Sequence, residues 1–413
     1  MKVAVYAIAK NEEQNVERWL NTVKDADGIY VLDTGSTDRT VELLRAGGAN
    51  VTIWPVHKEF RFDAARNSAM ELIPLDYDLC VSLDFDEILA EGWREQLNHF
   101  TGDAANYTLI FSFDKFGNVT CSYPRLAIHK RRGFYWTYPA HEVLVPAREG
   151  FDIDHTLPIT VVHTPSAPKQ PGHYLDLLRL GYAENPKDPR TLQYFARELM
   201  YCEQYQTAND IFLKHIAVEP HPQFRAESLR FIAHMASILN QLEVCEVSLL
   251  RAICEFPDAR EPYCELAMLY FQTGEYEQCI GMLRGALRIL DRPSVPMILK
   301  DEYYSYWPHH LLAVAYMRLG LQKTGEENLQ IALSKCTGEI PESLLNDALK
   351  VGAHVRSLSA GSGQEVEQER IPVVVEEGTE RLSGEIPEVE SPLPVGESRI
   401  ENEVQGSSGT EIG

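Results

Sequence analysis

The nine residues LCVSLDFDE, at positions 79–87, place a short apolar run directly before three acidic residues. The apolar run predicts a buried β-strand, and Asp84, Asp86 and Glu87 follow at its carboxyl end. Three like charges so close together are costly unless a cation or hydrogen-bond donors compensate for them. Carboxylates suit Mg²⁺ or Mn²⁺, which usually bind one or two of them together with substrate phosphate. The stretch therefore predicts a divalent-metal site, and a solvated acidic loop is the alternative.

Upstream of this stretch, short apolar runs alternate with amphipathic runs. The expected elements are strands at 2–9, 28–32 and 51–54 and helices at 13–23, 37–46 and around 63–72. Such alternation indicates a parallel sheet with crossover helices, whose ligands bind where the carboxyl ends of the strands lead into loops. The first 168 residues therefore predict a nucleotide-binding α/β domain.

Two further polar stretches follow predicted strands in this region. One is AKNEE (9–13), after the first strand, and the other is LDTGSTD (32–38), after the second. The carboxylate of Asp33 can accept hydrogen bonds from a base or a ribose, and Gly35 permits a tight turn. Asp, Gly, Ser and Thr after a strand are also ordinary turn formers. Taken alone, these stretches leave both interpretations open.

The joint order of NEE (11–13), DTGSTD (33–38), FDAARN (62–67) and LDFDE (83–87) resembles a family 2 glycosyltransferase with the GT-A fold. The resemblance implies a mixed, mostly parallel sheet with flanking helices that binds a nucleotide-diphospho-sugar. It further implies that Asp33 contacts the base, and that Asp84 and Asp86 hold the ribose and a divalent metal, Mn²⁺ or Mg²⁺. Arg66 is then expected near the diphosphate. The nucleotide-binding residues expected in all are Ala9, Asn11, Glu13, Asp33, Arg66 and Asp84.

Two later segments supply candidates for the chemistry of transfer. In YPAHEV (138–143), Glu142 is the expected general base, with His141 as the alternative. His141 and Glu142 resemble a His-Glu pair in a subgroup of these enzymes that is similar to lipopolysaccharide-core glucosyltransferases. The alternative is that both residues only orient a loop. His163 follows the last predicted strand, where relatives often return a residue to the metal or diphosphate, so the expected metal ligands are Asp86, Asp84 and His163. A lone histidine is otherwise more often a structural residue.

From about residue 170 the strand signal ends and a pattern of paired helices repeats at spacings of 37, 34 and 46 residues. Alanine recurs at equivalent positions, 196, 233, 267 and 313, where small side chains let two helices approach closely. The pattern resembles the tetratricopeptide repeat. We therefore expect an all-α tetratricopeptide-like solenoid over 169–356, with a capping helix near 344–351.

Composition limits the remaining possibilities. The chain has 413 residues and a net charge of −23, which disfavours a nucleic-acid-coating role. Residues 357–413 hold thirteen Glu, three Arg and no aromatic residue, which predicts a disordered acidic tail. No apolar run is long enough for a membrane span, and eight scattered cysteines indicate reduced, buried thiols. A cytoplasmic location, bacterial or in a phage-infected host, is therefore expected.

The resemblance to family 2 glycosyltransferases implies a metal-dependent inverting glycosyltransferase of the hexosyltransferase type. The donor would be a nucleotide-sugar, most simply a UDP-sugar, and the acceptor a protein, a peptide or an envelope glycan. The helical repeats would recruit the acceptor or form a homodimer. The alternatives are a catalytically degenerate repeat scaffold, a transferase acting on a hydroxymethylated DNA base, and a nucleotidylyltransferase. The last usually needs a Gly-rich basic loop after the first strand, where this chain has KNEE (10–13).

Overall fold

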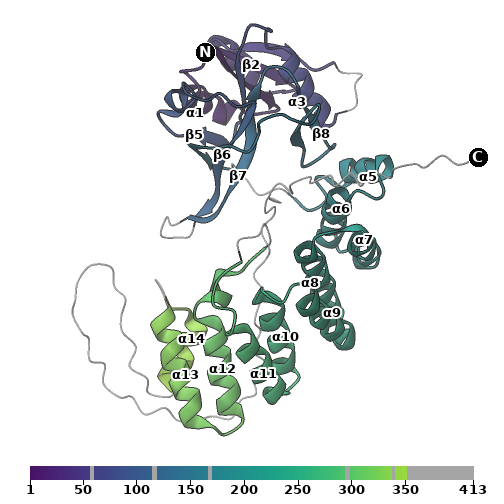
Figure 1. Ribbon diagram of the computed structural model, residues 1–413, viewed down its shortest axis with the longest axis vertical. Helices are drawn as coiled ribbons and strands as arrows, with labels where there is room; N and C mark the ends of the chain where they lie inside the picture. The colour runs from purple at the N-terminus through teal and green to yellow at the C-terminus, as the bar shows by residue number, and fades with distance from the viewer. Residues whose placement is uncertain (56–59, 114–118, 166–169, 294–297, 337–339, 351–413) are drawn as a thin grey trace, which may run out of the picture. The chain divides into compact units, whose positions relative to one another are not determined.

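The computed structural model describes residues 1–55, 60–113, 119–165, 170–293, 298–336 and 340–350. These residues form two compact units that divide between Ala208 and Asn209. The first unit carries a β-sheet and the second is built from helices (Figure 1). The predicted domain limits at 168/169 and 356/357 stay predictions, because the chain at both points lies outside the described residues, as does the predicted disordered tail.

The first unit is built on an eight-stranded sheet with the spatial order β3-β2-β1-β4-β7-β6-β10-β5. Strands β1 to β4 run parallel, and β7 joins them through antiparallel pairs with β4 and β6. The predicted mixed, mostly parallel sheet is therefore confirmed. The strands are β1 (Val3–Ala9), β2 (Gly28–Asp33), β3 (Asn50–Ile53), β4 (Leu79–Ser82), β5 (Glu87–Leu89), β6 (Ala104–Phe113), β7 (Val119–Lys130) and β10 (Thr156–His163), with β8 (Phe134–Thr137) and β9 (Val143–Pro146) pairing separately.

Helices cover both faces of the sheet because alternate residues of a strand point to opposite sides. Val3, Val5 and Ala7 of β1 pack with α1 and α2 in one core. Ala4 and Tyr6 pack with α3 in the other. The helices of this unit are α1 (Glu13–Thr22), α2 (Thr40–Ala46), α3 (Phe62–Glu71), α4 (Trp93–Gln96), α5 (Leu175–Glu184) and α6 (Pro189–Tyr201). The predicted elements are confirmed, although α2 begins three residues later than expected.

A buried hydrogen-bonded chain crosses the second core. The Trp136 indole donates to the Tyr6 hydroxyl over 2.7 Å, and that hydroxyl donates to Nε2 of His129 over 2.9 Å. Nδ1 of His129 then donates to the Lys130 carbonyl over 2.8 Å, so the ring is neutral with its proton on Nδ1. Burial lowers the pKa of His129 to about 4.

Acid should therefore weaken this unit through His129. The unfolded chain binds a proton near the ordinary histidine pKa of about 6.5, whereas the native ring stays neutral down to about pH 4. Where the unfolded state binds more protons than the native state, stability falls as the pH is lowered, so a change from pH 7 to pH 5 should cost about 2 kcal/mol. Urea unfolding at both pH values measures the loss. His129→Phe should remove this part of the pH dependence, and an unchanged dependence would contradict the assignment.

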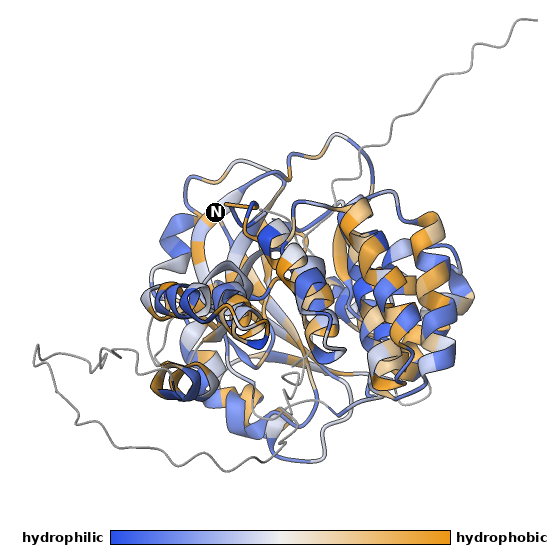
Figure 2. Ribbon diagram, turned by 90° about the horizontal axis from the view of Figure 1, so that it is seen from below, coloured by the Kyte–Doolittle hydropathy of each residue, from blue (hydrophilic) through white to orange (hydrophobic). Residues whose placement is uncertain are grey.

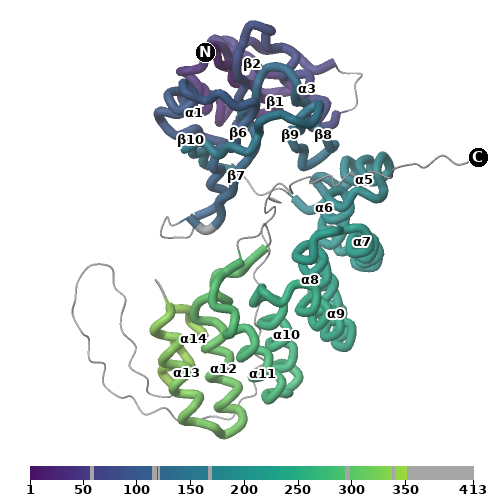
Figure 3. Tube along the Cα trace, in the orientation of Figure 1, coloured from purple at the N-terminus to yellow at the C-terminus, as the bar shows by residue number. Residues whose placement is uncertain are grey.

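The second unit consists of antiparallel helix pairs. In Figure 3 α8 lies beside α9, α10 beside α11 and α12 beside α13, in agreement with their contacts. The helices of the structure carry both hydrophobic and hydrophilic residues (Figure 2). Hydrophobic residues of α8 to α12 form one core, and those of α12 to α14 form another. The helices are α7 (Tyr205–Val218), which spans the division between the units, α8 (Pro222–Ile238), α9 (Leu242–Glu255), α10 (Glu261–Gln272), α11 (Tyr276–Ala286), α12 (Trp307–Arg318), α13 (Gln322–Lys335) and α14 (Glu342–Lys350).

The small positions of the repeat behave as predicted. Ala196, Ala233, Ala267 and Ala313 are all buried, as are the packing thiols Cys245 and Cys279. None of the eight cysteines, all of which lie in the described residues, forms a disulfide. Five are buried as expected, but Cys121 and Cys202 are only half-buried and Cys254 is exposed, so the expectation of buried thiols is wrong for these three. Among the described residues, no helix combines the length and the apolar character needed to cross a bilayer.

The 46-residue spacing contains an inserted segment that returns to the helices. The backbone N–H of Ile298 donates to Glu227 over 2.8 Å, and that of Lys300 donates to Glu261 over 2.9 Å. Arg230 donates to the Ile298 carbonyl over 2.9 Å. The segment therefore satisfies buried charged groups of α8 and α10, which explains how the repeat tolerates the insertion. It ends in a 3₁₀ turn, η1 (Asp301–Tyr304).

Candidate active site

The predicted polar stretches meet at one edge of the sheet. Ala9 lies opposite Asp33 in the β1–β2 pair, and Tyr6 lies opposite Ser82 in the β1–β4 pair. The loops that follow these three parallel strands therefore leave the sheet at the same edge. Ala9 closes the first of them, because its carbonyl accepts from the amide and the hydroxyl of Thr34 over 2.8 and 3.0 Å.

Asp33 ends β2 and is buried. Its Oδ1 accepts the backbone N–H groups of Gly35 and Ser36, each over 3.1 Å. Gly35 has a φ of 110°, which a side chain would disfavour. The other oxygen, Oδ2, is buried and has no hydrogen-bond partner among the described residues. A buried acceptor without a hydrogen-bond partner is costly. An N–H group of a bound molecule can remove that cost by donating a hydrogen bond to Oδ2.

Asn11 and Glu13 organise the turn that precedes α2. Asn11 has a φ of 58°, and its side-chain oxygen accepts the backbone N–H of Thr37 over 2.8 Å. Glu13 is exposed, and its carboxylate accepts the backbone N–H of Arg39 over 2.9 Å. These contacts join the AKNEE and DTGSTD stretches, so both residues have a structural role here. Their predicted contact with a nucleotide stays a prediction.

Arg66 is the centre of the site. It projects from α3, is 4% exposed and lies with its guanidinium carbon 5.0 Å from the centre of the Trp136 ring. Its Nη2 donates to Asp84 over 2.7 and 3.0 Å, and its Nε donates to Glu142. A third bond runs from Nη1 to Ser82 over 3.2 Å. One guanidinium therefore joins two predicted site carboxylates from separate segments.

A second guanidinium belongs to the site but was absent from the sequence-based set. Arg125 of β7 donates to Glu87 and, over 3.3 Å, to Asp84. Burial alone would raise the pKa of Asp84, but the two arginines outweigh it and hold that pKa well below its usual range. Glu87, 2% exposed, also accepts the Asp84 backbone N–H over 3.0 Å. Burial raises its pKa, against the influence of Arg125.

Asp86 and His163, two of the three predicted metal ligands, lie side by side. His163 ends β10, and its Nε2 lies 3.3 Å from Oδ2 of Asp86. Burial alone would lower the pKa of His163, but the Asp86 carboxylate outweighs it and raises that pKa. Both oxygens of Asp84 accept guanidinium bonds, which leaves Asp86 and His163 as the better-placed ligands. No cluster of three metal-ligating side chains occurs in the described residues, so substrate phosphates would have to complete the coordination.

Glu12 is a further acid near this edge that the sequence-based set omitted in favour of Glu13. Its backbone N–H donates to Thr40 over 2.7 Å, which fixes the loop after β1. Burial raises the pKa of Glu12, and the carboxylates of Asp86 and Asp84 add to the rise. The signal was present in the sequence, because Glu12 and Glu13 adjoin in the AKNEE stretch, but only packing distinguishes them.

The two candidate bases differ in their surroundings. The Glu142 side chain is 9% exposed and bonded to Arg66, inside the cluster of charges. The His141 ring instead stacks on Tyr194 of α6, with ring centres 4.1 Å apart and planes 19° apart. The structure thus brings Glu142 together with Arg66 and Asp84, and places the His141 ring against a helix.

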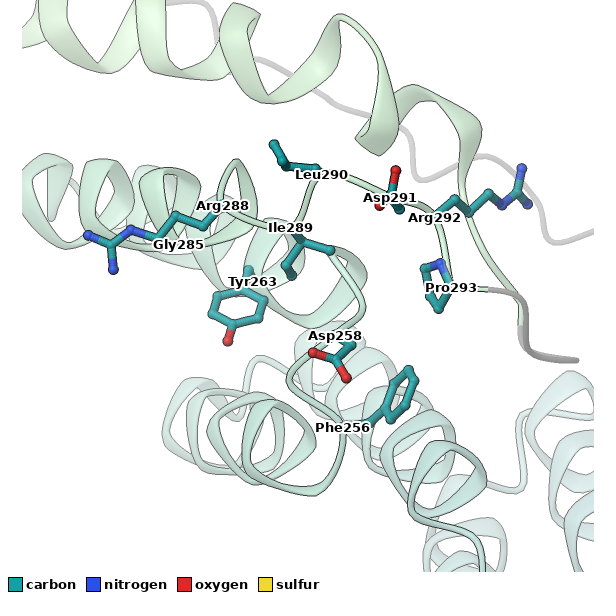
Figure 4. Close-up of a pocket in the computed structure, with 10 residues that line it drawn as sticks. All are labelled: Phe256, Asp258, Tyr263, Gly285, Arg288, Ile289, Leu290, Asp291, Arg292 and Pro293. Carbon is teal, nitrogen blue, oxygen red and sulfur yellow. The ribbon is translucent and has the colours of Figure 1, made fainter.

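A separate cavity of about 650 Å³ lies in the second unit (Figure 4). Arg288 and Arg292 extend away from each other at opposite ends of its lining, and Leu290 is 82% exposed. None of the predicted site residues lines it. The lining residues are Phe256, Asp258, Tyr263, Gly285, Arg288, Ile289, Leu290, Asp291, Arg292 and Pro293.

Residues 5–147 match the family model described as Glycosyl transferase family 2, so this part of the chain is a family 2 glycosyltransferase domain. A TPR repeat-containing protein of Synechococcus elongatus is 29% identical over 147 residues, 35% of each chain. An uncharacterized glycosyltransferase of Rickettsia bellii is 30% identical over 104 residues, 24% of this chain and 32% of that protein. The chain spans about a third of the length of these relatives.

Solved structures of helical-repeat proteins also align with the chain. A crystal structure of MamA aligns with a TM-score of 0.33 and 17% identity over 39% of this chain and 85% of that chain. YrrB, described as a TPR protein with an unusual peptide-binding site, aligns with a TM-score of 0.33 and 13% identity over 43% of this chain and 81% of that chain.

Proposed function

We propose that the chain is a metal-dependent inverting glycosyltransferase that moves a sugar from a nucleotide-sugar, most simply a UDP-sugar, to an acceptor hydroxyl. The observation that carries the proposal is the Arg66–Asp84–Glu142 cluster, which lies within the residues that match the family 2 model, together with the nearby Asp86–His163 pair. Asp84 and Asp86 follow β4, at the edge where such sheets bind ligands. Arg66 comes from α3, Glu142 from the loop between β8 and β9, and His163 from the end of β10.

The base and ribose would lie over the ends of β2 and β4. Asp33 offers its unpartnered Oδ2 to an N–H of the base, such as the imide N–H of uracil. Asp84 is held rigidly by two arginines, which suits the resemblance-based role of a ribose acceptor. Such fixed acceptors orient the donor before reaction and so lower the entropic part of the barrier.

Charge balance argues for a cation at the diphosphate. The site holds more carboxylates than guanidinium groups, and a bound diphosphate would add further negative charge. Asp86 and His163 would hold the divalent metal, whose chemistry when bound is to stabilise the negative charge of the leaving diphosphate. The site carboxylates are Asp84, Asp86, Glu87 and Glu142, against Arg66 and Arg125.

Glu142 is the proposed general base. An acceptor hydroxyl attacks the anomeric carbon from the face opposite the diphosphate, so the new C–O bond forms as the bond to the diphosphate breaks. The hydroxyl proton passes to a carboxylate within about 3 Å. Glu142 adjoins the Arg66 cluster, whereas the His141 ring is engaged by Tyr194, which favours Glu142 over His141.

A panel of nucleotide-sugars tests the proposal. The wild-type protein should release a nucleoside diphosphate from at least one of them, UDP-glucose being the first choice, in the presence of Mn²⁺. Chelation with EDTA should stop the release, and added Mn²⁺ should restore it. A rate no faster than that of Asp86→Ala with every donor would refute the enzyme and favour the degenerate scaffold.

The helical repeats are proposed to bring the acceptor, a protein or peptide ahead of an envelope glycan. The pairing of a family 2 domain with repeat helices supports recruitment of a macromolecule. A hydroxymethylated DNA base is disfavoured, because the chain carries a net charge of −23. Homodimer formation through the repeats is a further proposal, which sedimentation equilibrium tests. The eight cysteines, none of which is in a disulfide in the described residues, support a reducing cytoplasm.

A further inference from the structure

We infer that helix α6, which lies beyond the predicted catalytic domain, is part of the active site and positions Glu142. This inference rests on the proposed function and assigns new roles to Asp188, Arg190 and Tyr194. None of the three touches the reacting atoms, so each is a positioning residue. All of the contacts involved lie inside the first compact unit.

The loop between β8 and β9 is strained. Tyr138 has a φ of 78° and His141 a φ of 54°, in the region that side chains disfavour. Each such residue costs about 1 kcal/mol or more and persists only where its surroundings enforce it. Glu142 follows directly, so whatever enforces these two conformations also sets the direction of its carboxylate.

One side of the loop is held by α3. The backbone N–H of Phe62 donates to the Pro139 carbonyl over 3.0 Å. The Asn67 side chain exchanges two bonds with the backbone of Trp136, each over 2.8 Å. These contacts fix the start of the loop next to Arg66, but they do not reach His141.

The other side is held by the start of α6. Asp188 caps the helix by accepting the Thr191 N–H over 2.7 Å, and its other oxygen accepts the Tyr138 hydroxyl over 3.1 Å. Arg190 donates to the His141 carbonyl over 3.0 Å. The N-terminal end of α6 therefore forms hydrogen bonds with both strained residues, Tyr138 and His141.

Tyr194, one helical turn later in α6, also contacts the loop. It is 7% exposed, and its ring stacks on His141 while the Arg190 guanidinium lies 5.0 Å from its centre. The Arg190 guanidinium also lies 5.6 Å from the centre of the Tyr138 ring. The stack therefore links the loop to α6 through side chains as well as backbone. Without it, the loop can relax and carry Glu142 away from Arg66.

The test compares three substitutions in the full chain. Tyr194→Ala should lower kcat about 100-fold, because misplacing a reacting group by about 1 Å has that effect, with the KM for the nucleotide-sugar unchanged. Tyr194→Phe keeps the stacked ring and should restore kcat. Tyr182→Ala is the matched control, because Tyr182 stacks on Phe195 within the α5–α6 hairpin. This control should retain wild-type kcat.

Hydrogen exchange of the 138–142 amides provides a readout that needs no activity. Exchange should rise in Tyr194→Ala and stay at the wild-type level in Tyr194→Phe and Tyr182→Ala. A folded Tyr194→Ala with wild-type kcat and exchange would overturn the inference, and so would an equal loss in Tyr182→Ala. If the wild type transfers no sugar at all, the proposed function fails, and the exchange comparison still decides whether α6 holds the loop.

Discussion

Replacing Asp86 by asparagine should lower the rate of sugar transfer about 1,000-fold and leave the thermal midpoint near that of the wild type. A loss of this size is typical when one group that stabilises charge in the transition state is removed. The thermal midpoint should change little because the Asp86 side chain is 31% exposed and lies beside His163. No guanidinium in the described part of the chain bonds to the Asp86 side chain. Initial rates with a nucleotide-sugar and Mn²⁺, together with a thermal melt, measure both quantities.

Asp84→Asn is the matched comparison, because it makes the same chemical change two residues away. Its carboxylate accepts bonds from Arg66 and Arg125, so the amide would leave the buried Arg66 and the half-buried Arg125 without their shared anion. Breaking such a pair costs about 3 kcal/mol or more. This variant should therefore lose both transfer and stability. Equal melting of the two variants would contradict the described division of roles between Asp84 and Asp86.

Replacing Arg66 by leucine should have the largest effect on the first unit. The side chain is 4% exposed, and its removal leaves Glu142 and Asp84 without a cation they share. We expect a loss of about 3 to 5 kcal/mol, which corresponds to a fall of about 10 °C in the thermal midpoint for a unit of this size. Transfer should fall below detection, because Glu142 would lose its fixed orientation.

Arg66→Lys separates charge from geometry. Lysine keeps the positive charge, but a single ammonium cannot bond Ser82, Asp84 and Glu142 with the fixed fork of a guanidinium. It should recover much of the stability and little of the transfer. Full recovery of transfer by lysine would mean that the charge alone matters at this position.

The strand ends of the site were predictable because each signal is local. An apolar strand followed by Asp33, or by Asp84 and Asp86, can be recognised within a few residues, and the family resemblance added Arg66. The periodicity of the helices likewise predicted the repeats. These signals depend on neighbours in sequence, which the chain displays directly.

The rest of the site depends on contacts between distant segments. Arg125 reaches Glu87 from 38 residues away, and Arg190 reaches His141 from 49 residues away. No local pattern marks either arginine as part of a site. The antiparallel pair β6–β7, which delivers Arg125, was likewise outside the predicted strand and helix alternation.

These strand ends are proposed to bind a nucleoside diphosphate together with a divalent cation. Titration of UDP into the wild-type protein by calorimetry, with Mn²⁺ and then with EDTA, tests this proposal most directly, with Asp86→Asn as the comparison. We predict one UDP bound per chain with Mn²⁺, and binding weakened at least 10-fold by EDTA or by the substitution. Binding that is absent under all conditions, or unchanged by both, would contradict the account.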